Sequence, residues 1–472
     1  MNDRLAERVR QRADWATALS DRIWELAEVG LQEHQSSALL AEELAKAGFE
    51  VTSGVADMPT AFVATYGSGK PVVAILGEYD ALPGLSQKAV PRREPLREGA
   101  PGHGCGHNLL GVAGVAAAIA LKEEMESSGL GGTVRYYGCP AEETLVGKVF
   151  MVRDGLFDDV DAALTWHPAA LNSVWAASSL ANNSAKFRFY GRSAHAAANP
   201  DMGRSALDAV EIMNVGANYL REHVVEKARI HYVITRGGGE PNVVPAEAEV
   251  WYYVRAPKRE QVEEIYQRLL LCAKGAAIMT ETEYDVEFLA GCYQYLPNRV
   301  LGKLLHQNLR KVGAPPFDEA DRQFARQLRE TFAPGQQEAA VSRFKELAEE
   351  LRGKDLHDGV LPLRESDEVM PGSTDVGDVS WVVPTAQFAT ACTVIGAAGH
   401  SWQMTATSGM SIGHKGMLTA AEVLALTVRD LLTRPEVLAE AREEFRRATE
   451  GSPYRCPLPQ GARPPHHQLE KH

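Results

Sequence analysis

The segment PVVAILGEYDALPG, residues 71–84, gives the first indication of the fold class. Its opening part, 71–76, is a short apolar run that predicts a buried strand, and polar and turn-forming residues follow directly. Similar elements continue along the chain, namely a helix over 109–125, the strand TVRYY (133–137), a helix near 145–153 and the strand AALTW (162–166). Because strands and helices alternate, we predict an α/β domain with a mainly parallel sheet.

A different pattern begins near residue 184. The order there is strand KFRFY, helix RSALDAVEIMNVGANYLREHV, strands RIHYVIT and EAEVWYYVRA, helix REQVEEIYQRLLLCAKGAAIM and strand YDVEFL. This βαββαβ order predicts a compact, separate module that ends near Cys292. We therefore expect an inserted domain at 184–292 and a main domain built from residues 1–183 and 293–472.

Two stretches of the main domain are expected to be peripheral. The charged region 299–352 is typical of helices with solvated faces and predicts a structural insertion. The tail, about 456–472, is rich in Pro, Gly and His, and we expect it to be disordered. We do not expect His466 and His467, which lie in this tail, to bind metal.

The bulk composition excludes several classes of partner. The chain has 472 residues, of which 45% are hydrophobic and 24% charged, as in ordinary globular proteins. Its net charge of -13 argues against nucleic acid or an anionic membrane as the main partner. No run of about eighteen apolar residues predicts a membrane span, and the six cysteines are scattered as in a protein with reduced thiols. We expect a cytoplasmic protein that acts on a small molecule.

Polar side chains follow the carboxyl ends of the inferred strands. They are Glu78 and Asp80 after VVAIL, Glu142 and Glu143 after TVRYYGC, His167 after ALTW, and His400 after FATACTVIGAAG. Open α/β sheets bind ligands at this edge, because the carboxyl ends of parallel strands meet there. These residues are therefore candidates for one common site.

The stretch GHGCGHNLLG, residues 102–111, has two interpretations. Cys105 and His107 are separated by one glycine, so they can present a thiolate and an imidazole to one ion while the glycines let the loop close. The alternative is a glycine-rich loop that leads into a helix and carries a small buried thiol. The stretch alone does not distinguish them.

The other candidates also have simpler explanations. The adjacent Glu142 and Glu143 suggest one metal-binding carboxylate and one acid–base group, but acidic residues also stabilise a first helical turn. His167 precedes a proline and could simply be hydrogen-bonded. Taken together, however, the thiolate, imidazole and carboxylate groups suit Zn²⁺ or Mn²⁺, and the donor count fits two ions better than one. Paired ions of this kind support amide hydrolysis.

The motifs as a set resemble a family of co-catalytic metallopeptidases and amidohydrolases that includes aminoacylases, carboxypeptidase G-type enzymes and indoleacetyl-amino-acid hydrolases. The resemblance covers nearly the whole chain and rests on WELAEVGLQEHQSSALLAEELAKAGFEV, GEYDALPGL, GHGCGHN, PAEET, GRSAHAAANPDMGRSALDAV, PNVVPAEAEVWYYVRAP and GAAGHSW. Within this family, GEYDALPGLSQ, STDVGDVSW and SGMSIGHKGM are most similar to the branch that acts on aminobenzoyl-glutamate.

The resemblance implies a role for each candidate of the main domain. It implies a catalytic domain that holds two divalent ions, Mn²⁺ or Zn²⁺, with Cys105 as the bridging ligand rather than a nucleophile. The remaining ligands would be His107, Glu143, His167 and His400. Glu142 would act as the general base and acid.

Two positions need comment. The chain departs from family members that carry a histidine two residues before the first acid of the GEYD loop, because Leu76 stands there. We therefore expect His107 to supply the ligand and Glu78 to orient it. His414 is a rival for the last ligand, but we favour His400 because its GHSW turn follows a strand directly.

The resemblance also assigns residues of the inserted module, which would be a lid and dimerisation domain. His195 matches a lid histidine that, in related dimers, reaches into the partner's active site and stabilises the substrate oxyanion. Asn242 and Arg255 match lid positions linked to substrate carboxylate or carbonyl binding. For Arg255, a salt bridge at the strand end is an equally good explanation.

The predicted activity is hydrolysis of an N-acyl amino acid, with an aromatic acyl group as in aminobenzoyl-glutamate. Other N-acyl amino acids or dipeptides are alternative substrates, and a non-catalytic binding component of a hydrolase complex is an alternative role. We expect a homodimer or a heterodimer with a related chain.

Overall fold

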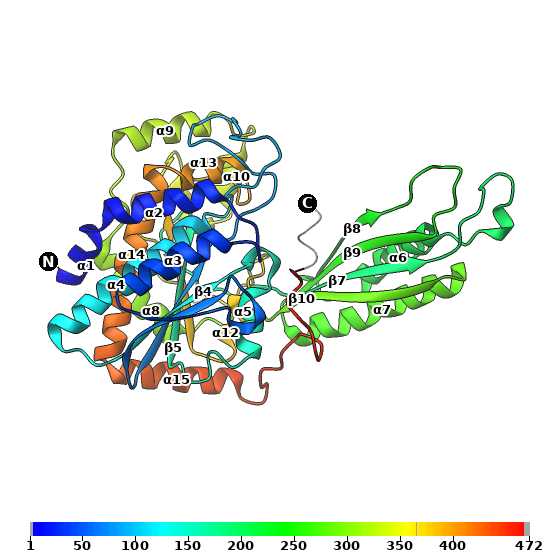
Figure 1. Cartoon of the computed structure of the whole chain (residues 1–472). Coiled ribbons are helices and arrows are strands. Elements are labelled where there is room, and N and C mark those ends of the chain that lie inside the picture. Colours follow the sequence, from blue (N-terminus) through cyan, green and yellow to red (C-terminus); the bar gives the residue numbers. More distant parts are fainter. Residues whose placement is uncertain (1–2, 365, 467–472) are drawn as a thin grey trace.

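The computed structural model describes residues 3–364 and 366–466. Figure 1 shows a rounded body from which an elongated second unit projects on one side. The body contains a seven-stranded sheet in the order β1-β2-β4-β3-β5-β11-β6, and the projecting unit contains a four-stranded sheet in the order β10-β7-β9-β8. The predicted fold class, an α/β domain with a mainly parallel sheet and a second β-rich module, is confirmed.

Parallel pairing is concentrated in the middle of the larger sheet. Strands β4, β3, β5 and β11 pair in parallel, and the outer pairs are antiparallel. The strands are β1 (Glu50–Ser53), β2 (Phe62–Ser68), β3 (Val72–Glu78), β4 (Gly132–Cys139), β5 (Ala162–Ala169), β6 (Ser173–Val174) and β11 (Thr385–Ala391). Every residue of β3 is buried, because its successive side chains point into two different apolar clusters.

Helices enclose the larger sheet. They are α1 (Arg4–Arg10), α2 (Ala13–Leu26), α3 (His34–Lys46), α4 (His107–Ser128), α5 (Gly147–Arg153), α8 (Arg299–Val312), α9 (Glu319–Arg329), α10 (Gln336–Ser342), α11 (Ala348–Leu351), α12 (Val376–Ser380), α13 (Trp402–Ser408), α14 (Ser411–Thr433) and α15 (Pro435–Thr449). In the described residues, none of the helices has the length and apolar character needed to cross a membrane.

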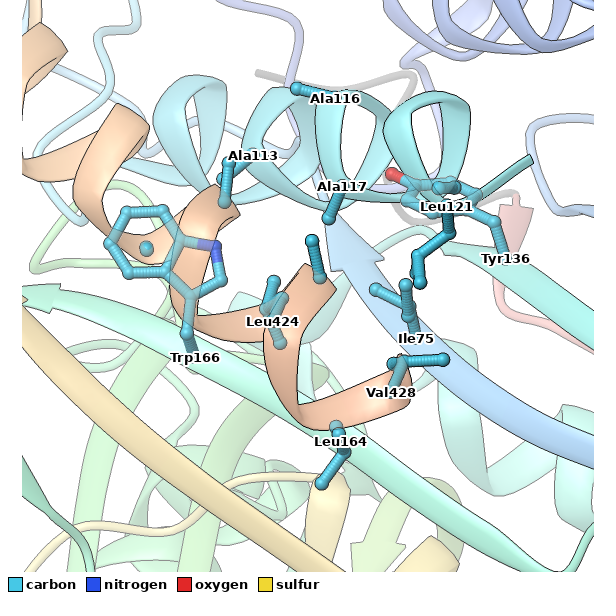
Figure 2. Close-up of a cluster of buried hydrophobic side chains, with 14 of the residues drawn as sticks. Ile75, Ala113, Ala116, Ala117, Leu121, Tyr136, Leu164, Trp166, Leu424 and Val428 are labelled. Atoms are coloured by element: carbon cyan, nitrogen blue, oxygen red, sulfur yellow. The ribbon is translucent and has the colours of Figure 1, made fainter. Parts of the chain in front are cut away.

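The central helices α4 and α14 pack directly on each other and on the sheet. Figure 2 shows Ala113 and Ala117 of α4 near Leu424 of α14, with Ile75 and Leu164 of the strands close by. The small alanine side chains let the helix backbones approach closely, so a continuous core forms around them. This core holds β3, β4 and β5 in register, and with them the loops at their carboxyl ends.

The projecting unit, which we call the lid, has its own core. Its elements are β7 (Ala181–Tyr190), α6 (Ala206–Leu220), β8 (Arg229–Arg236), β9 (Glu247–Ala256), α7 (Arg259–Thr280) and β10 (Glu283–Cys292). Phe187, Val250 and Leu269 belong to one buried cluster between the sheet and the two helices. The predicted βαββαβ order is present, and β7 and β10 connect the lid to the body.

Two expectations differ from the structure. The first part of the supposed insertion at 299–352 is α8, whose Leu301, Leu305 and Leu309 are fully buried in the main core. The i, i+4 spacing of these leucines places them on one face, which explains why a helix with charged residues is nevertheless part of the body. In the tail, Leu458 is buried against the core, so residues 456–466 lie on the body instead of being disordered. His467 lies outside the described residues.

Candidate metal centre

The glycine-rich loop 102–106 leads into α4 next to the carboxyl ends of the parallel strands. Gly106, the residue before α4, has a φ of 79°, a left-handed conformation that glycine adopts without strain. A Cβ at this position would lie 3.0 Å from Cβ of Pro168, so the contact also requires glycine. The carbonyl of Gly104 accepts a hydrogen bond from the backbone N–H of His400, 3.0 Å away. Two loops that are distant in sequence are therefore held together around Cys105.

Two groups of potential metal-binding atoms share the thiol of Cys105. The first consists of Cys105, His107 and His167, and the second of Cys105, Glu143 and His400. Within each group, the ligand atoms all lie within 4.8 Å of one another. Sγ of Cys105 is 3.4 Å from Nε2 of His167, and Nε2 of His400 is 3.3 Å from Oε2 of Glu143. The structure thus brings together every metal ligand that the sequence predicts.

Two buried atoms of this cluster have no hydrogen-bond partner among the described residues: Nε2 of His107 and Oε1 of Glu143. Buried polar atoms are nearly always satisfied, so unpaired atoms in such a position indicate a missing partner. A divalent cation is a suitable partner, because Zn²⁺ and Mn²⁺ bind thiolates, imidazole nitrogens and carboxylate oxygens. The residues present therefore fit metal binding.

Asp80 orients two members of the cluster, His107 and Glu143. Its Oδ1 is 2.8 Å from Nδ1 of His107, and its Oδ2 accepts a hydrogen bond from the backbone N–H of Glu143 at 2.9 Å. A carboxylate on Nδ1 turns the other ring nitrogen, Nε2, toward the cluster. We expected this role for Glu78, but Glu78 lies on the other side of the ring, 3.3 Å from Nε2. The orienting residue is therefore Asp80.

A strained turn after β4 presents the two neighbouring glutamates. Ala141 and Leu145, which flank the turn, have φ values of 55° and 60°, a conformation that is unfavourable for residues other than glycine. The backbone N–H of Ala141 donates to the buried carboxylate of Glu33 at 2.8 Å, which holds the turn in place. Such enforced strain is common at functional sites.

Glu142 is buried beside the ligand groups. Its side chain belongs to a third cluster with Glu78 and His107, and its Oε2 is 4.0 Å from Nε2 of His107. Burial raises the pKa of Glu142 well above its usual value, and the negative charges of Glu78 and Asp375 raise it further. A carboxyl group with a raised pKa next to a metal site is suited to accept and return a proton.

Burial also shifts the pKa of His167, His400 and Cys105, whereas at His107 the neighbouring Cys105 and Asp80 outweigh burial and raise the pKa. It lowers the pKa of His167 to about 4 and lowers that of His400, so both imidazoles are neutral at pH 7 and have a lone pair to offer. Burial, together with the charge of Glu143, raises the pKa of the Cys105 thiol. Because the thiolate is the form that binds metal, cation binding must release a proton and becomes stronger as the pH rises.

The three predicted site residues of the lid, Arg255, His195 and Asn242, lie at two different ends of the lid. Arg255, near the end of β9, pairs with Asn182 at the body end of the lid, and its buried Nε has no partner in the described part of the chain. His195 and Asn242 lie in loops at the other end of the lid strands, where the N–H of Ala196 donates to the carbonyl of Asn242. Figure 1 shows that the lid extends away from the body. Within one chain, Arg255 therefore lies at the end of the lid nearer the body, whereas His195 and Asn242 lie at the far end.

Of the two C-terminal histidines, His400 lies in the cluster, as we predicted, and His414 does not. His414 lies in α14, where its Nε2 is 2.8 Å from Oδ1 of Asp21, and it is in none of the ligand groups found among the described residues.

Two neighbours of the cluster were not predicted from the sequence. Trp175 stacks on the ring of His167 with 5.4 Å between centroids. Lys148 directly precedes the apolar run of α5, and this position next to a buried run could have indicated a buried lysine.

Comparisons with known proteins identify relatives of this chain. A family profile described as a peptidase dimerisation domain matches residues 182–277, which lie within the lid. The chain is 46% identical to the B subunit of p-aminobenzoyl-glutamate hydrolase from Escherichia coli K12 over 458 residues, which is 95% of each chain. It is also 30% identical to the A subunit of the same hydrolase from the same organism, over 47% of this chain and 53% of the relative.

A solved structure shares the fold. It is a dinuclear metal binding peptidase of the M20 family from Bacillus subtilis, which superimposes with a TM-score of 0.56 at 16% identity, covering 90% of this chain and 99% of the other. At this level of identity the likeness concerns the fold, that is, the body and the projecting lid.

Proposed function

The chain belongs to the M20 peptidase family, whose members are amide-bond hydrolases, and we propose that it cleaves the amide bond of an N-acyl amino acid with two divalent cations. The observation that carries this proposal is the position of Cys105, whose thiol is common to both groups of ligand atoms. One cation would be held by Cys105, His107 and His167, and the other by Cys105, Glu143 and His400. We propose Mn²⁺ or Zn²⁺ on the basis of the mixed sulfur, nitrogen and oxygen ligands.

Bound divalent cations supply two effects here: they polarise a carbonyl group, and they lower the pKa of water. Glu142 transfers the proton. Its carboxylate accepts a proton from the attacking water while the new C–O bond forms at the amide carbon. It then gives that proton to the departing nitrogen while the C–N bond breaks.

The substrate class is supported by the surroundings of the cluster. Arg255 is a positive charge at the body end of the lid whose buried Nε has no partner among the described residues, and a guanidinium in this place suits the carboxylate of an amino acid. The indole of Trp175, stacked on His167, is an apolar surface suited to an aromatic acyl group. Together with the similarity to the B subunit of p-aminobenzoyl-glutamate hydrolase, these two side chains favour an aromatic acyl amino acid such as aminobenzoyl-glutamate. The six cysteines, all free thiols, are consistent with action in the cytoplasm.

The assay that tests this function uses metal-depleted protein. We expect no hydrolysis after dialysis against a chelator, and recovery when Mn²⁺ or Zn²⁺ is added back. A panel containing aminobenzoyl-glutamate, other N-acyl amino acids and dipeptides would rank the substrates by kcat/KM. If the metal-loaded protein hydrolyses none of them, either alone or together with a related partner chain, the protein has a binding role instead.

We further propose that His195 and Asn242 act on the site of a partner chain, either a second copy or a related protein. Nδ1 of His195 accepts hydrogen bonds from the N–H groups of Ala197 and Ala198, at 3.2 and 3.1 Å. In the neutral ring the proton is therefore on Nε2, which can donate to a substrate oxyanion. The match of the lid to a peptidase dimerisation domain supports this arrangement.

Co-expression of two inactive variants tests the shared site. If the chain forms a homodimer, Glu142→Gln and His195→Ala chains together should recover about a quarter of the wild-type activity, because half of the dimers are hybrids with one intact site. Differently tagged chains allow the hybrids to be purified. Hybrids that show no more activity than either parent would place His195 in the site of its own chain or outside the reaction.

A further inference from the structure

Lys148 is a fully buried lysine that bridges two buried carboxylates. Its Nζ is 2.6 Å from Oε1 of Glu78 and 2.6 Å from Oδ1 of Asp375. The side chains of Lys148 and Asp375 are 0% exposed, and that of Glu78 is 3% exposed. Removing three charges from water is costly, and such a cluster is stable only when its geometry is well satisfied.

The cluster joins three separate parts of the body. Glu78 ends β3, Lys148 lies in the first turn of α5, and Asp375 precedes α12 within the segment STDVGDVSW. Asp375 is doubly bound, because its Oδ2 also accepts a hydrogen bond from the backbone N–H of Lys148 at 2.8 Å. Asp375 therefore fixes both the backbone and the ammonium group of Lys148.

The cluster also reaches the ligand groups. While Oε1 of Glu78 contacts Lys148, its Oε2 lies 3.3 Å from Nε2 of His107, the buried atom that lacks a hydrogen-bond partner among the described residues. The start of α5 is fitted closely to the turn before Glu142, because a Cβ at Gly147 would lie 1.9 Å from the carbonyl oxygen of Pro140. This packing fixes the position of Lys148, and Glu78 connects Lys148 to His107.

We propose that Lys148 is a positioning residue that acts through Glu78. Asp375 anchors the ammonium group of Lys148, which in turn holds Oε1 of Glu78. This contact fixes the position of Oε2 of Glu78 next to Nε2 of His107. Without Lys148, Glu78 would keep only its contact with His107 and could turn, so the surroundings of that ring would no longer be fixed. This inference rests on the proposed function of His107 as a metal ligand.

A double-mutant cycle on Co²⁺ affinity tests the proposal without measuring turnover. We compare wild type, Lys148→Met, Glu78→Gln and the double variant by competition with a chelating dye, and record the visible absorption of bound Co²⁺. We expect Lys148→Met to bind Co²⁺ about 10–100-fold more weakly than wild type. In the Glu78→Gln background, the same substitution should change the affinity by less than about threefold, because its effect passes through Glu78.

Two further variants make the result decisive. Asp375→Asn keeps the size of the side chain and removes the anchor, so it should weaken Co²⁺ binding in the same direction, and it replaces Lys148→Met in the cycle if that protein does not fold. Lys415→Met breaks an ion pair between a partly exposed lysine and the buried Asp321, 2.6 Å away and apart from the ligand groups, and should lower stability while leaving Co²⁺ affinity unchanged.

Equal effects of Lys148→Met in both backgrounds, or no effect in either, would overturn the role of Lys148. A failure of the proposed function looks different. In that case the wild-type protein binds Co²⁺ but hydrolyses no N-acyl amino acid, and the cycle can still be measured. If the wild-type protein binds no Co²⁺, the metal centre and the role of Lys148 are both overturned.

Discussion

Glu142→Gln is expected to keep its bound cations and to lose about 10²–10⁴-fold in kcat, the usual contribution of a positioned acid–base group. The amide has nearly the same size as the carboxyl group, so the strained turn around it should persist. It cannot, however, accept a proton from water. Metal content measured by mass spectrometry, together with kcat and KM for aminobenzoyl-glutamate, separates loss of the base from loss of the metal.

The pH profile gives a second signature of Glu142. As a base, it must be ionised, and burial raises its pKa. The rate of the wild-type enzyme should therefore rise with pH across an acidic limb that is absent from Glu142→Gln. Glu422 is a matched control, since burial raises its pKa to about 7 and it lies in α14, paired with Arg10. Glu422→Gln should leave kcat unchanged. Wild-type turnover by Glu142→Gln would exclude Glu142 as the base.

Cys105→Ser is expected to weaken the binding of both cations by more than about 100-fold, since even residues that only support metal ligands contribute 10–100-fold. The reason is geometric: the thiol belongs to both groups of ligand atoms, so its loss affects both. A neutral hydroxyl is a much poorer ligand than a thiolate. Equilibrium dialysis with Zn²⁺ or Mn²⁺, followed by metal analysis, measures the change.

The control for this substitution is another buried cysteine. Cys392 is 0% exposed and contacts Thr390 in the core, apart from the ligand groups. Cys392→Ser should lower the thermal stability while the protein still binds two cations. If Cys105→Ser retains both cations with unchanged affinity, Cys105 is not a bridging ligand.

The parts of the fold that the sequence predicts are those with strong apolar patterns. VVAIL and TVRYY lie in β3 and β4, whose residues are almost all buried. The edge strands β1 and β6 escape prediction because β1 is largely exposed and β6 has only two residues. The role of α8 in the core is also missed, since charged residues on its solvent face conceal the leucines on the other.

The candidate site was predictable as a set of residues but not as a geometry. Cys105, His107, Glu143, His167 and His400 lie in loops and strand ends that a parallel sheet brings to one edge. The acid that supports His107 was predicted wrongly as Glu78, because Glu78 and Asp80 are only two residues apart in sequence and only the structure shows that Asp80 contacts Nδ1. Lys148 and Asp375 are far apart in sequence, and only the packing of α5 against α12 brings them together.

The most direct test of the metal centre is anomalous X-ray diffraction from crystals grown with Mn²⁺ or Zn²⁺. We predict two anomalous peaks about 3.5–4 Å apart, as in other paired sites, with Sγ of Cys105 bound to both. His107 and His167 should contact one peak, and Glu143 and His400 the other. A single peak, or two peaks that Cys105 does not touch, would contradict the proposed dinuclear centre.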